Sequence, residues 1–135
     1  MDGAIHPTLL ESISAWVLIV SFTLSLLYGL WRATAKAGVS RHDSMRAFVR
    51  EVWLYVVAAI VIVLLLTGVP FAAWIGLAFS ALVILVSIFY YNPRMMIERR
   101  PGLFDWFEDL VYTGLLFVAA ALLTLEVSGL TLAQP

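Results

Sequence analysis

The sequence contains no cysteine and few charged residues. Of its 135 residues, 13% are charged and 63% are hydrophobic, and the mean hydropathy is +1.00. The missing cysteines exclude disulfides, thiolate metal ligands and cysteine nucleophiles. Soluble domains carry about 25% charged residues, so this chain has too little polar surface to cover a water-soluble globule. The composition therefore predicts a protein that is embedded in a lipid bilayer.

Features of nucleic-acid-binding proteins and of common enzymes are also missing. The formal net charge is -1, whereas nucleic-acid-binding domains carry an excess of basic residues. There is no glycine-rich phosphate loop, no HExxH or GxSxG motif and no Ser/His/Asp constellation. We therefore expect no nucleic-acid partner, no cofactor, no bound metal and no catalytic residue, and we favour a function that is not enzymatic.

The first twelve residues lack a positive charge. They contain Asp2 and Glu11 but no lysine or arginine, whereas a secretory signal peptide begins with a basic region. We expect the first apolar stretch to remain in the mature protein.

Four long apolar stretches, about 13–31, 52–69, 71–91 and 108–127, are present instead. At 1.5 Å per residue, helices of this length reach across roughly the 30 Å of a bilayer core. Lipid offers no hydrogen-bond partners to the backbone, so each stretch is predicted to be helical. Gly68 is expected to end the second helix, and Pro70 to lie in the first turn of the third. The sequence thus predicts an all-α, four-helix transmembrane bundle that forms one domain over residues 1–135.

The basic residues indicate how this bundle is threaded. All eight lie in two segments, 32–50 and 94–100. Short cytoplasmic loops carry the excess of lysine and arginine. We therefore expect both termini on the non-cytoplasmic side, in a bacterial or archaeal cytoplasmic membrane.

Each of these two loops is predicted to contain a short interfacial helix. Ser40 or Asp43 is expected to cap the first helix. The Asn92-Pro93 pair is expected to end the third span, with Pro93 opening the second interfacial helix. Arginines in and near these helices are predicted to contact anionic lipid headgroups. They are Arg46, Arg50, Arg94, Arg99 and Arg100.

Three acidic residues precede the last apolar stretch. Asp105, Glu108 and Asp109 have the spacing of one helix face. We favour a structural interpretation, in which Asp105 is the N-cap, Glu108 lies at N3 and the acids pair with loop arginines. The alternative is a site at the membrane interface for a divalent cation or a phosphorylated lipid head.

Glu126 is the only candidate for an ionisable residue inside the membrane. If the fourth span ends near this residue, the carboxylate lies at the outer interface, which is the interpretation that we favour. If the helix continues beyond it, the carboxylate is immersed, needs a partner and becomes a candidate proton or cation site.

Small and hydroxyl-bearing residues recur along the predicted spans. They allow helices to approach closely, within this chain or against another protein. The residues concerned are Ser21, Ser25, Gly76, Ser80 and Gly114.

These features favour a non-catalytic accessory subunit of a larger membrane complex, whose partners are other membrane proteins. The alternative is a homo-oligomeric channel or small transporter, built from copies of this chain around hydroxyl-lined faces. A membrane-interface enzyme or lipid-binding protein is the least favoured of the three.

Overall fold

The computed structural model describes residues 7–38, 43–96 and 102–129, and every regular element in these ranges is helical. The elements are α1 (Leu9–Thr34), α2 (Met45–Arg50), α3 (Val52–Thr67), α4 (Ala72–Val86), a π-helix (Ser87–Met96) and α5 (Leu103–Val127). Four helices are long and apolar enough to cross a membrane: Leu9–Thr34, Met45–Thr67, Ala72–Tyr91 and Leu103–Val127. The predicted all-helical architecture with four such helices is confirmed, and it indicates a membrane-embedded protein.

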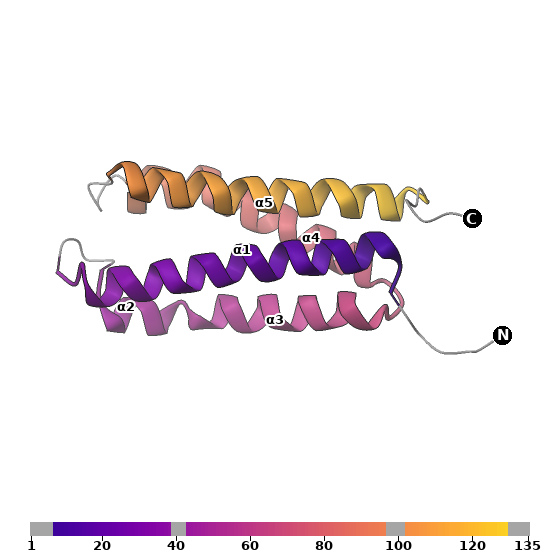
Figure 1. Ribbon diagram of the computed structural model, residues 1–135, viewed down its shortest axis with the longest axis horizontal. Coiled ribbons are helices and arrows are strands. Elements are labelled where there is room, and N and C mark those ends of the chain that lie inside the picture. The colour runs from indigo at the N-terminus through magenta and orange to yellow at the C-terminus, as the bar shows by residue number, and fades with distance from the viewer. Residues whose placement is uncertain (1–6, 39–42, 97–101, 130–135) are drawn as a thin grey trace.

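The long helices form a closed ring of neighbours. α1 packs against α3 and α5, and α4 packs against the same two helices (Figure 1). Two ends of the bundle are distinguished below. The basic end is where α1 finishes, α2 lies and α5 begins; the terminal end is where α1 begins, α3 turns into α4 and α5 finishes.

An aromatic cluster joins all four helices near the centre. The ring of Phe22 on α1 lies 6.2 Å from Tyr55 on α3, 5.6 Å from Phe79 on α4 and 5.5 Å from Tyr112 on α5, measured between ring centroids. Two of these contacts are edge-to-face, an arrangement that the aromatic quadrupole favours. Phe22 therefore fixes the distance of α1 from the other three helices.

Most of the predicted packing residues face this interior. Ser21 and Ser80 are fully buried, and Ser25 shares a 2.9 Å hydrogen bond with Tyr55. Gly76 lies so close to α3 and α5 that an added Cβ would sit 3.0 Å from a methyl group of Leu123. Gly114 is the exception because it faces outward on α5 and has no packing role inside the chain.

The turn between α3 and α4 is only partly as predicted. Gly68 ends α3 in the left-handed conformation, with φ 71°, as expected. α4 begins at Ala72, however, so Pro70 precedes the helix rather than lying in its first turn. Phe71 between them also has a positive φ of 66°, which costs a non-glycine residue about 1–2 kcal/mol. Two left-handed residues allow the chain to reverse within this short segment.

The predicted stop at Asn92-Pro93 is wrong. The helix continues from α4 as a π-helix to Met96, with Pro93 inside it. In an α-helix the proline ring clashes with the carbonyl four residues earlier, and π-helical winding replaces that register by an i→i+5 register. The segment from Pro93 to Met96 thus extends α4 and does not open a separate interfacial helix; residues 97–101 lie outside the described ranges.

Candidate functional site

A buried ion cluster lies at the basic end, centred on Arg32 in the last turn of α1. Its guanidinium is bidentate on Asp43, with Nε 2.9 Å from Oδ1 and Nη2 2.6 Å from Oδ2. Nη1 donates a longer hydrogen bond of 3.3 Å to Oδ1 of Asp105 on α5. Arg32 is 2% exposed and Asp43 is fully buried. Arg32 therefore links Asp43, which follows α1 in the sequence, to Asp105 at the start of α5.

Asp105 accepts three kinds of donor. Besides Arg32, the hydroxyl of Tyr28 donates to its Oδ1 at 2.5 Å, and the backbone N–H of Gly102 donates to its Oδ2 at 2.8 Å. The predicted role of Asp105 as N-cap is wrong, because α5 begins two residues earlier and Gly102 occupies the cap position. Asp105 is the N3 residue, and Glu108 lies one turn further into the helix. A carboxylate at N3 serves the helix start by reaching back to the cap N–H.

The described residues next to Asp43, between α1 and α2, help to position it. Gly38 adopts φ 90°, and its N–H donates to the carbonyl of Asp43 at 2.8 Å. Ser44 then caps α2 by accepting from the N–H of Ala47 at 3.1 Å. Asp43 is therefore not the predicted cap, since its side chain is used by Arg32; the other predicted cap, Ser40, lies outside the described residues.

The acidic face of α5 points into the protein. Asp105, Glu108 and Asp109 are 6%, 6% and 4% exposed, and the latter two have further interactions within the chain. No group of three or more His, Asp or Glu in the described ranges is placed to hold a metal ion. The face is thus an internal surface between α5 and its neighbours.

The predicted headgroup arginines take no part in this cluster as far as the described residues show. Arg46 and Arg50 are exposed on α2. Arg99 and Arg100 lie outside the described residues, as does the side chain of Arg94. Within the described residues, Arg32, which the sequence groups with the loop cations, pairs with Asp43 and Asp105.

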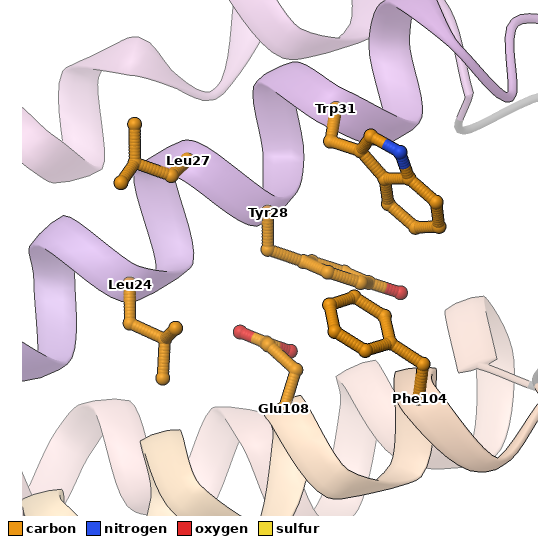
Figure 2. Close-up of a pocket in the computed structure, with 6 residues that line it drawn as sticks. All are labelled: Leu24, Leu27, Tyr28, Trp31, Phe104 and Glu108. Carbon is orange, nitrogen blue, oxygen red and sulfur yellow. The ribbon is translucent and has the colours of Figure 1, made fainter.

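A groove runs between α1 and α5 beside the cluster (Figure 2), with a volume of about 410 Å³. Its lining is almost entirely apolar and consists of Leu24, Leu27, Tyr28, Trp31, Phe104 and Glu108. Three of its rings pack on one another, with centroids 5.3–6.2 Å apart. The ammonium group of Lys36 lies 5.6 Å from the centroid of Trp31. The groove therefore combines an apolar wall, one carboxylate and a nearby cation.

Glu126 belongs to a second, smaller polar group at the terminal end. It lies in the last turn of α5, half-buried, and accepts a 2.8 Å hydrogen bond from the hydroxyl of Thr8. Thr8 is also the N-cap of α1 in a capping box with Glu11. α5 ends at Val127, so the carboxylate lies at the end of the helix and has a partner. This hydrogen bond joins the start of the first helix to the end of the last one.

Sequence reasoning missed Arg32 and Tyr28 as members of a site. The available signal is that Tyr28 and Arg32 are spaced i, i+4 at the end of an apolar helix, which places both on one face. Asp105 lies 73 residues from Arg32 in the sequence, and no local pattern links residues so far apart.

The comparisons with protein-family models, with curated proteins and with solved structures find no match to this chain.

Proposed function

We propose that this chain is a non-catalytic subunit that packs beside a larger membrane protein, with both termini on the non-cytoplasmic side. The distribution of charge supports this threading. At the basic end, the described cations are Arg32, Lys36, Arg46 and Arg50, whereas the described ionisable side chains at the terminal end are Glu11 and Glu126. An excess of lysine and arginine marks the cytoplasmic side.

The internal use of the charged groups supports a structural role. The guanidinium of Arg32 is occupied by two carboxylates, and Asp105 accepts from three donors. These groups are saturated by contacts that fix the bundle, so they are not poised for proton transfer or nucleophilic attack. An enzymatic site would instead need such groups converging on an open space.

The observation that carries the proposal is the outward position of Gly114. An added Cβ at this residue meets no atom within 4 Å, so nothing inside the chain requires a glycine there. Glycine in the middle of a helix costs about 0.5–1 kcal/mol relative to alanine. A glycine on a lipid-facing surface allows another helix to approach closely. The exposed stripe around it consists of Leu110, Gly114, Phe117, Ala121 and Leu125.

The structure offers less support for the alternative of a channel formed by copies of this chain. Ser21 and Ser80, predicted to pack helices together and available as pore-lining hydroxyls only under this alternative, are fully buried inside a single bundle. The stripe around Gly114 is apolar, and a ring assembled through it would not expose these hydroxyls. We therefore propose that the stripe contacts a helix of a different membrane protein.

The test is the composition of the particle extracted from the native membrane. We expect the chain to co-purify with larger, different proteins. Gly114→Leu should release it from them while its own stability in detergent stays unchanged, because the side chain has room. Ala59→Leu, at an exposed position on α3, is the matched control and should leave the particle intact. Recovery as a defined ring of identical chains, or as a lone monomer, would refute the proposal.

A further inference from the structure

The groove between α1 and α5 has the walls of a site for an acyl chain. Leu24 and Leu27 extend it toward the middle of the bundle, while Trp31 and Phe104 enclose it near the basic end (Figure 2). Its volume of about 410 Å³ falls within the range of roughly 300–1,000 Å³ that is typical of small-molecule sites. Tryptophan and tyrosine side chains are enriched at the interface between lipid headgroups and acyl chains.

The carboxylate of Glu108 lies at the base of the groove and favours ligands that carry a hydrogen-bond donor. In Figure 2 the Glu108 carboxylate extends from α5 toward α1, between Leu24 and the ring of Tyr28. Glu108 is only 6% exposed, so a group that reaches it has to be small. A carboxylate has about four acceptor positions, and Glu108 also interacts with other groups of the chain, so an ammonium in the groove would share this carboxylate with them.

A cation lies near the same groove. The ammonium group of Lys36 is held 5.6 Å from the centroid of Trp31, which lines the groove near the basic end. A flexible lysine at such a position provides a point charge for a phosphate. The groove thus offers a carboxylate inside and a cation beside its aromatic wall.

We propose that this groove binds a zwitterionic phospholipid whose head group ends in a primary ammonium, as in phosphatidylethanolamine. The ammonium donates to Glu108, the phosphate contacts Lys36, and an acyl chain lies along Leu24 and Leu27. This inference is independent of the proposed docking stripe, because Gly114 does not line the groove.

The chemistry of Glu108 predicts which lipids are rejected. A quaternary choline head has no N–H to donate and is too bulky for an almost closed carboxylate. An anionic glycerol head brings a negative phosphate and no compensating cation, and its hydroxyls donate to Glu108 only uncharged hydrogen bonds, which are weaker than those of an ammonium. We expect the order phosphatidylethanolamine, then phosphatidylcholine, then phosphatidylglycerol.

Native mass spectrometry of the purified full-length chain, titrated with these three lipids carrying identical acyl chains, tests the proposal. We expect phosphatidylethanolamine to bind on the order of tenfold more tightly than phosphatidylglycerol, the factor that one charge-assisted hydrogen bond supplies. Glu108→Gln should abolish this preference. Glu51→Gln, an exposed glutamate at the same end of the bundle, should preserve it.

A second variant keeps the test valid if Glu108→Gln does not fold. Leu27→Trp adds bulk at a residue that lines the groove and is 60% exposed, and it leaves Glu108 in place. It should weaken the binding of all three lipids. Equal or tighter binding of phosphatidylglycerol by the native chain, or unchanged binding by Leu27→Trp, would overturn the proposal.

Discussion

Removal of the Asp43 carboxylate should destabilise the protein far more than a typical substitution in a loop. Asp43→Ala deletes two charge-assisted hydrogen bonds, of 2.9 and 2.6 Å, and leaves Arg32 with the 3.3 Å contact to Asp105 as its remaining carboxylate contact in the described structure. Both partners are almost fully buried. Breaking a buried pair by removing one member costs about 3–5 kcal/mol, and a loss of about 3 kcal/mol lowers the folding equilibrium constant by roughly a hundredfold.

Reversible unfolding of the full chain in mixed detergent micelles, or steric trapping in bicelles, measures this loss. Arg46→Met removes an exposed arginine at the same end and should change the free energy of unfolding by no more than about 0.5 kcal/mol.

The double variant Arg32→Met/Asp43→Leu distinguishes the cost of leaving Arg32 without its partner from the cost of losing the ion pair itself. It leaves no lone charge at the pair itself, and Asp105 retains its bonds from Tyr28 and Gly102. Replacing a buried pair by apolar residues is often neutral or stabilising, so the double variant should be more stable than Asp43→Ala. If Asp43→Ala costs less than about 1 kcal/mol, the typical value for a solvated surface pair, the assignment of a buried cluster is refuted.

Three further substitutions probe separate parts of the bundle. Gly76→Ala should lower the free energy of unfolding by about 1–3 kcal/mol through overpacking, because its new Cβ would lie 3.0 Å from Leu123; an unchanged denaturation midpoint would contradict this packing. Tyr28→Phe removes the 2.5 Å hydrogen bond to Asp105 and should cost about 1.5–3 kcal/mol in the same assay, whereas a neutral result would show that the carboxylate is satisfied without it. Thr8→Val removes both the N-cap of α1 and the hydrogen bond to Glu126 and should cost at least about 1 kcal/mol, with faster amide hydrogen exchange in the first turn of α1; equal exchange rates in that turn would argue against the cap.

The positions of the four long helices are the part of the fold that the sequence predicts best. Apolar runs of sufficient length have one solution in lipid, because every backbone group has to be paired within its own segment. The end of α3 was also predictable, since Gly68 takes a left-handed conformation that few other residues adopt.

Predictions that relied on one local rule were less successful. The rule that a helix ends before proline failed at Pro93, where a change of helical winding accommodates the ring. The acid-capping rule identified the right region but the wrong register, because Asp105 serves as N3 as readily as it would serve as N-cap. Whether a helix ends at a proline, and which position an acidic residue takes at a helix start, depends on residues outside the motif.

The ion cluster could not be predicted, for a different reason. Composition and spacing place Arg32 among the cations of a loop, and nothing local indicates that it is buried. Its burial follows from the packing of α1 on α5, which brings Asp105 to it across 73 residues. Long-range pairing of this kind is a property of the folded bundle.

The pairing of the first long helix with the last has a consequence for biosynthesis. α3 and α4 are joined by a short turn and are able to pair as soon as both have been made, but the packing face that α1 presents to α5 waits until the last helix enters the membrane. Until then Arg32 lacks Asp105, and the hydroxyl of Ser21 lacks the Tyr112 carbonyl to which it donates. A chain that stops before residue 103 therefore leaves Arg32 with Asp43 but without Asp105, and leaves the Ser21 hydroxyl without its acceptor on α5. Arrival of α5 is the step that closes the bundle and supplies the missing partners of both groups.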